Sequence, residues 1–100
     1  MNILLVCTGG MSTSLIASRL EEAAEDRGLD ITAEAFPSDN LADIIADYDV
    51  VLLGPQVKYK QEELAAVADE HGIPLEVIDG EAYGMMEEDK ILDQALEMSD

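Results

Sequence analysis

Short apolar runs alternate with amphipathic stretches along this chain of 100 residues, and turn residues separate them. That alternation is typical of successive βα units around a parallel sheet. Strands are expected at 2–6, 31–36, 50–53 and 75–78. Apolar residues at helical spacing predict a helix over 12–27 that stops at Gly28, a short helix capped by Asp39 or Asn40, a helix that stops at Gly72, and a last helix through Ile91, Leu92, Ala95 and Leu96.

Two of the four apolar runs have no polar residue on either face. Residues 3–6 and 50–53 are apolar throughout, as strands covered on both sides must be. Glu34 and Glu76 interrupt the other two runs, which fits edge strands with one side partly in water. The expected fold is therefore α/β, with a four-stranded parallel sheet in the order 2-1-3-4 and helices on both faces.

The composition suffices for one domain over residues 1–100, because 48% of the residues are hydrophobic and can form a continuous core. The single cysteine excludes an internal disulfide, and no residue spacing is typical of a metal site, so neither a metal nor another cofactor is expected. The run at 2–6 is too short for a signal peptide core or a membrane span. We therefore expect a cytoplasmic protein that does not insert directly into a membrane.

The chain is strongly acidic, since 23 Asp and Glu residues against five Lys and Arg give a formal net charge of -18 at pH 7. A surface of that sign repels nucleic acid and anionic lipid, so no nucleic-acid partner is expected. The acidic residues are scattered over the expected helices, as on solvated outer faces. Adaptation to high salt, where ions screen the self-repulsion, is a second interpretation of the same pattern.

Right-handed crossovers between the strands place a ligand crevice at the carboxyl ends of the first and third strands. Cys7 lies there, and residues 54–59 flank the other side. Successive backbone N–H groups in the loop after Cys7 can form an anion-binding nest at the positive end of the following helix. The expected phosphate-binding residues of this loop are Thr8, Gly9, Gly10, Met11, Ser12, Thr13 and Ser14.

Cys7 is the expected nucleophile of this loop. The field of the nest favours the thiolate, which is the reactive form of cysteine. A thiolate at the opening of the nest attacks an incoming phosphoryl group, and the product would be a cysteinyl phosphate. The structural alternative is that Cys7 is a small buried hydrophobic residue at a strand end. The two glycines and the hydroxyl cluster that follow favour the chemical role.

Residues 7–15, CTGGMSTSL, resemble the active loop of the enzyme IIB component of the lactose/cellobiose (chitobiose) class of the bacterial sugar phosphotransferase system. Residues 53–59, LGPQVKY, are similar to the family's segment after the third strand. Ile78 and Asp79 with residues 83–86, YGMM, are similar to its closing region. Together the three matches span nearly the whole chain.

The resemblance implies a phosphotransferase subunit that acts as an enzyme component rather than as a complete enzyme. A phosphohistidine on the partner IIA protein would give its phosphoryl group to Cys7. Cys7 would then pass it to a sugar of the cellobiose, chitobiose or lactose type, bound by a membrane-embedded IIC transporter. The loop suits this role, because phosphoryl transfer needs an in-line nucleophile and charge stabilisation more than covalent help.

Two other functions are consistent with the same loop. Low-molecular-weight protein tyrosine phosphatases have a similar loop with an arginine six residues after the cysteine, followed by serine, whereas Thr13 and Ser14 stand at those positions here. The missing guanidinium, and the lack of an aspartate in residues 54–56, predict weak hydrolysis. The non-enzymatic alternative is a regulatory module that only binds an anion or a partner.

Four more residues are expected near the crevice. Gln56 and Tyr59 are candidates for contact with the phosphoryl group or with the partner, and Lys58 for offsetting part of the negative charge. Tyr83 follows the fourth strand at the same end of the sheet and is a candidate for a docking surface. For each of the four, a structural role in shaping or packing the loops is the alternative.

Overall fold

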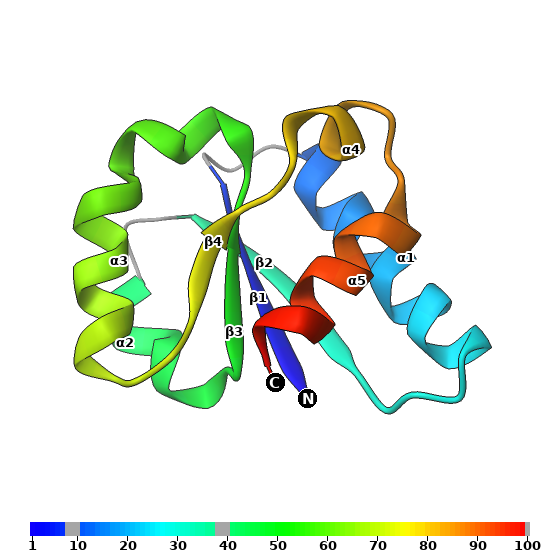
Figure 1. Cartoon of the computed structure of the whole chain (residues 1–100), viewed down its shortest axis with the longest axis horizontal. Helices are drawn as coiled ribbons and strands as arrows, with labels where there is room; N and C mark the ends of the chain where they lie inside the picture. Colours follow the sequence, from blue (N-terminus) through cyan, green and yellow to red (C-terminus); the bar gives the residue numbers. More distant parts are fainter. Residues whose placement is uncertain (8–10, 38–40, 100) are drawn as a thin grey trace.

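The computed structural model describes residues 1–7, 11–37 and 41–99, with side chains in the second range described from residue 14 onward. Strands and helices alternate along the chain (Figure 1). In order they are β1 (Asn2–Cys7), α1 (Met11–Asp26), β2 (Thr32–Pro37), α2 (Leu41–Ile44), the 3-10 helix η2 (Ile45–Asp47), β3 (Val50–Leu53), the 3-10 helix η3 (Pro55–Lys60), α3 (Gln61–Glu70), β4 (Leu75–Val77), α4 (Gly80–Gly84) and α5 (Glu88–Met98). The four expected strands are confirmed, each with its ends within one residue of the predicted ends.

The four strands form one parallel sheet in the order β2-β1-β3-β4, which confirms the predicted order. β1 is central, and its Leu5 pairs with Ala35 of β2 on one side and with Leu52 of β3 on the other. Glu34 and Glu76, on the two outer strands, are both exposed. The polar interruptions in the sequence therefore mark the sheet edges, where a carboxylate stays in water.

Helices cover both faces of the sheet, so two hydrophobic clusters form (Figure 1). Ile3 and Leu5 of β1 point into the cluster under α1, α4 and α5. Leu4 and Val6 point into the cluster under α2, η2, η3 and α3. All four side chains are at most 1% exposed. Because successive side chains of a strand point to opposite faces, β1 contributes two of these four side chains to each cluster.

The helix ends agree with the stop signals, whereas two short elements were not predicted. Gly28 after α1 and Gly72 after α3 have φ angles of +74° and +67°, a backbone region that glycine adopts without steric cost. The unpredicted elements are η3 and α4, which contain six and five residues. Segments of one or two turns are too short to show helical periodicity. The expected cap at Asp39 or Asn40 lies outside the described residues.

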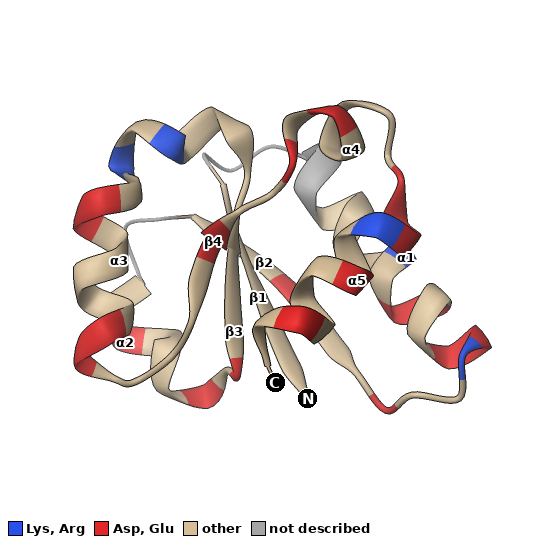
Figure 2. Cartoon of the chain, in the orientation of Figure 1, with Lys and Arg blue, Asp and Glu red and all other residues tan. Residues whose placement is uncertain are grey.

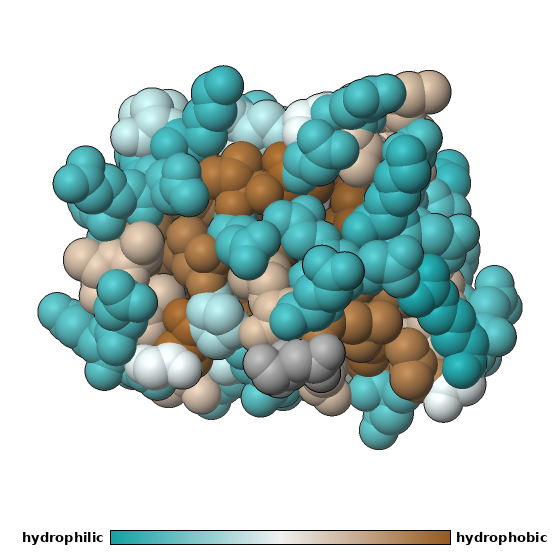
Figure 3. All heavy atoms as spheres, viewed as in Figure 1, coloured by the Kyte–Doolittle hydropathy of each residue, from teal (hydrophilic) through white to brown (hydrophobic). Residues whose placement is uncertain are grey.

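Acidic residues are spread over several helices rather than gathered in one segment (Figure 2). Hydrophobic residues are visible between the two helix layers, while the helices carry mostly hydrophilic side chains toward water (Figure 3). The prediction of solvated acidic faces is consistent with this arrangement. In the part of the chain that the structure describes, no helix is both long and apolar enough to cross a bilayer.

The central strand should dominate the stability of the fold. Leu5→Ala removes a side chain that is 0% exposed, so it should lower the free energy of unfolding by about 2–5 kcal/mol. Leu29→Ala, at a leucine that is 38% exposed, is the matched control and should cost clearly less. Urea denaturation followed by circular dichroism measures both, and equal losses would contradict the assignment of Leu5 to the core.

Self-repulsion among the carboxylates should make stability depend on salt. The Debye length falls from about 10 Å at 0.1 M to about 3 Å at 1 M ionic strength, so KCl should raise the melting temperature at pH 7. The rise should shrink at mildly acidic pH, where the carboxylates take up protons. A melting temperature that stays constant or falls with KCl at pH 7 would refute adaptation to high salt.

Candidate functional site

Cys7 ends the central strand at the carboxyl edge of the sheet. It pairs with Pro37 of β2, and its Sγ lies 3.9 Å from the carbonyl oxygen of Phe36. The side chain is only 3% exposed. Cys7 is one of the buried hydrophobic residues, although neither of the two hydrophobic clusters under the helices includes it. The sulfur is therefore shielded from water but placed where β1 gives way to the following loop.

The loop after Cys7 is only partly within the described residues. Thr8, Gly9 and Gly10 lie outside them, so the predicted nest of backbone amides stays a prediction. Helix α1 begins at Met11, and Ser14 in its first turn is exposed. The side chains of Ser12 and Thr13 are outside the description, although both residues are helical.

The start of α1 can nevertheless stabilise an anion. The first four N–H groups of a helix have no partner within the helix, and the helix dipole is positive there. The first turn of α1 contains no acidic residue. No carboxylate of the helix itself therefore competes for those donors, in a chain where acidic residues are common elsewhere.

Two of the predicted supporting residues meet across the carboxyl edge. The Gln56 side chain donates a hydrogen bond of 2.7 Å from Nε2 to the phenolic oxygen of Tyr83. This bond joins η3 to α4, the two elements that follow β3 and β4. Gln56 is exposed, while Tyr83 is half-buried against the cluster under α1. The sequence named both residues but not their contact, because they are 27 positions apart in elements that periodicity does not reveal.

Backbone hydrogen bonds attach η3 to the end of β1. The N–H of Gly54 donates to the carbonyl oxygen of Val6 at 2.8 Å, and the N–H of Val57 donates to the oxygen of Gly54 at 3.0 Å. Val57, a residue of η3, is fully buried. The backbone at the start of η3 is thus bonded to Val6, the residue that precedes Cys7 in β1.

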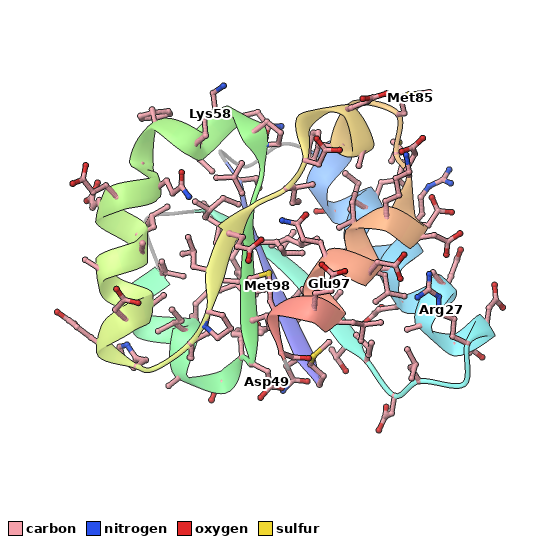
Figure 4. All side chains as sticks on the ribbon, in the orientation of Figure 1. Arg27, Asp49, Lys58, Met85, Glu97 and Met98 are labelled. Atoms are coloured by element: carbon pink, nitrogen blue, oxygen red, sulfur yellow. The ribbon has the colours of Figure 1, made fainter. Side chains whose placement is uncertain are left out.

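Lys58 and Tyr59 lie on the outer side of η3. Lys58 extends away from the body of the protein (Figure 4), and the Tyr59 side chain is 73% exposed. The predicted contact of Tyr59 with the phosphoryl group or the partner, and the predicted offset of negative charge by Lys58, stay predictions. The exposure of both side chains suits contact with a partner.

A metal-binding group and a cavity are two further features that could form a site among the described residues. Among the described residues, no group of three or more His, Cys, Asp and Glu side chains is arranged to hold a metal ion. A cavity of about 550 Å³ is lined by residues of the opposite edge, where both chain termini lie (Figure 1): Met1, Asp49, Gly72, Pro74, Met98 and Ser99. That cavity is thus separate from the end of β1.

Comparison with known proteins shows the family of this chain. A family model described as "PTS system, Lactose/Cellobiose specific IIB subunit" matches residues 2–94. The oligo-beta-mannoside-specific EIIB component of Bacillus subtilis is 40% identical over 96 residues, which cover 96% of this chain and 93% of that protein. The cellobiose-specific EIIB component of Lactococcus lactis is 41% identical over 95 residues, with 90% and 88% covered.

A solved structure supports the fold independently. The lactose-specific IIB component domain from Streptococcus pneumoniae superimposes with a TM-score of 0.90, covering 100% of this chain and 98% of that chain. Its sequence is 24% identical, so this likeness bears on the fold alone.

Gly54 should be needed for the position of the Gln56 side chain. A Cβ at Gly54 would meet Gln56 Oε1, while the φ of -64° suits alanine as well as glycine. Gly54→Ala should therefore displace the Gln56 side chain and break its bond to Tyr83. The free energy of unfolding should fall by only about 1 kcal/mol, because only a flexible side-chain end and one exposed hydrogen bond are affected.

Gln56→Ala is the matched variant, since it removes the same hydrogen bond without touching Gly54. Both variants should shift the NMR signals of the Tyr83 ring in the same direction, and urea denaturation gives the stability change. A loss of several kcal/mol in Gly54→Ala alone would show that the backbone, rather than the Gln56 side chain, has to move.

Proposed function

Because the chain belongs to the lactose/cellobiose-specific IIB family of the sugar phosphotransferase system, we propose that Cys7 is the residue that carries the phosphoryl group. The observation that carries this proposal is the position of Cys7, the last residue of a central strand directly before the loop that leads into α1. It is also the single cysteine of the chain. The proposed unit is residues 1–100, acting as one IIB phosphocarrier domain in the cytoplasm.

The proposed chemistry has two transfers. In the first, the Cys7 thiolate attacks the phosphorus of a phosphohistidine on the IIA protein, so that an S–P bond forms and the P–N bond breaks, with the electron pair left on the imidazole nitrogen. In the second, a sugar hydroxyl held by the IIC transporter attacks the same phosphorus. The O–P bond forms, the hydroxyl gives up its proton, and sulfur leaves as thiolate.

The loop residues are proposed to stabilise the charge of the transferred group. The backbone N–H groups of residues 8–14, with the hydroxyls of Thr8, Ser12, Thr13 and Ser14, would donate hydrogen bonds to the phosphoryl oxygens. The acid-free first turn of α1 supports this assignment, because its dipole acts on an anion without an opposing carboxylate.

The burial of Cys7 is consistent with a carrier. A thiol that is 3% exposed keeps water from the sulfur, and exclusion of water limits loss of the phosphoryl group by hydrolysis. Access for the donor then has to come with docking at the carboxyl edge, where the loop after Cys7 begins. The same burial would also suit a merely structural cysteine, so labelling of the residue decides between the two roles.

The sugar is proposed to be of the cellobiose, chitobiose or lactose type. Relatives named for an oligo-beta-mannoside and for cellobiose match this chain at 40% and 41% identity, so similarity to IIB components does not select one sugar. We assign the choice of sugar to the IIC transporter, which binds it.

Phosphorylation of Cys7 is directly measurable by mass spectrometry. After incubation with a phosphorylated IIA protein of the lactose/cellobiose class, the peptide that contains Cys7 should gain one phosphate. Cys7→Ser should remain folded, as judged by circular dichroism, and should lose both the acid-sensitive label and transfer to sugar. Transfer that persists in Cys7→Ser would eliminate the mechanism.

Hydrolysis of an aryl phosphate is the control for the phosphatase alternative. Turnover should be negligible, because Thr13 stands where the phosphatases have arginine. A protein that binds phosphate but is neither labelled on Cys7 nor active on the aryl phosphate would favour the regulatory module instead.

A further inference from the structure

Two long stretches of the chain contain no acidic residue. None of the 23 Asp and Glu residues lies in residues 1–20 or 50–61. These stretches contain β1 and β3, which are parallel neighbours in the sheet, and the segments that follow the two strands. η3 contacts both strands. Tertiary structure thus brings the two acid-free stretches together at the carboxyl edge, where Cys7 lies.

The positive charge at this edge is concentrated on η3. Elsewhere the cations are paired with carboxylates: Arg19 with Glu88 at 3.9 Å, Arg27 with Asp93 at 2.7 Å and Lys90 with Glu87 at 3.0 Å. The other two of the five Lys and Arg residues, Lys58 and Lys60, both lie on η3 (Figure 2). Lys58 is exposed, and among the described residues no carboxylate forms an ion pair with it.

Apolar side chains are exposed at the same edge. Tyr59 is 73% exposed, and the Lys60 ammonium lies 5.9 Å from the centre of its ring. Met85, which follows α4, is 66% exposed and lies at the same edge as Lys58 (Figure 4). An exposed aromatic ring beside cations, with a flexible methionine across the edge, is typical of residues that protein interfaces bury.

We propose that the η3 surface, defined as Lys58, Tyr59 and Lys60 with Met85 across the edge, docks an acidic face of the protein that delivers the phosphoryl group to Cys7. This proposal rests on the proposed function. The partner face is acidic because the η3 surface is cationic, while the carboxylates on the outer helix faces repel an anionic protein. Long-range repulsion from those faces and attraction at η3 together orient the encounter toward Cys7.

Glu62 and Glu63 confine the attraction to a small area. They lie in the first turn of α3, which begins at Gln61 directly after η3, and both are exposed, so negative charge follows the η3 lysines within a few residues. A partner that docks by charge therefore has to contact η3 itself rather than the neighbouring helix. The charge of Lys58 orients the approaching partner, and the ring of Tyr59 becomes buried against that partner when it docks.

The test uses the IIA protein of the lactose/cellobiose class from the same organism as the probe. Its binding to the full chain is measured by calorimetry at low and high KCl. Lys58→Gln should weaken binding about two- to fivefold at low salt, with a smaller effect at high salt. Tyr59→Ala should weaken it about tenfold or more, as expected for an aromatic anchor. Urea denaturation verifies that both variants are folded.

Lys90→Gln is the matched control, because it removes one positive charge from another exposed lysine, on α5. It should bind the IIA protein like the unchanged chain. Equal weakening in Lys58→Gln and Lys90→Gln would show an effect of net charge only and overturn the proposal. Unchanged binding in both Lys58→Gln and Tyr59→Ala, or no binding of the IIA protein at all, would overturn it as well.

A small phosphoryl donor separates this proposal from the function of Cys7. Phosphoramidate does not need a docking surface, so it should label Cys7 equally in the unchanged chain, Lys58→Gln and Tyr59→Ala. Loss of labelling by both donors in Lys58→Gln would place Lys58 at the phosphoryl group and overturn docking. If Cys7 is never labelled while the binding pattern holds, the phosphocarrier function fails and the docking surface stands.

Discussion

Burial of β1 on both faces is the constraint on which the rest of the structure depends. A strand whose four central side chains are at most 1% exposed needs helices above and below, and its N–H and C=O groups need a neighbouring strand on each side. Parallel pairing with β2 and β3 meets both requirements. Parallel pairing also brings the carboxyl ends of all three strands to one edge, so the position of Cys7 follows from the core rather than from the loop.

Charge is organised around the same edge. For the proposed phosphoryl carrier, carboxylates beside Cys7 would be unfavourable, because like charges repel an incoming phosphoryl group. In a chain of net charge -18, residues 1–20 and 50–61, which include β1 and β3, contain no acidic residue. Most of the acidic residues lie on the helices and others on the edge strands, where water and counterions screen them.

The sequence yields a prediction of the chemistry of the site but not of its geometry. Cys7 and the expectation of a phosphate-binding loop follow from an apolar run that ends in cysteine, two glycines and hydroxyls. The bond from Gln56 to Tyr83 could not be predicted, because it joins two short elements that carry no periodic signal. Nor could the burial of Cys7, since the carbonyl oxygen of Phe36 reaches its sulfur only through the pairing of β1 with β2.

The amino-acid sequence alone determined the class of fold and the strand order, and it predicts Cys7 as the nucleophile. These depend on local patterns: the lengths of apolar runs, the carboxylates that mark the edge strands, and the composition of one loop. Only the tertiary structure decided which distant segments share the carboxyl edge and how far the thiol is shielded. Those properties arise from contacts between residues far apart in the chain, and no local pattern of side chains encodes such contacts.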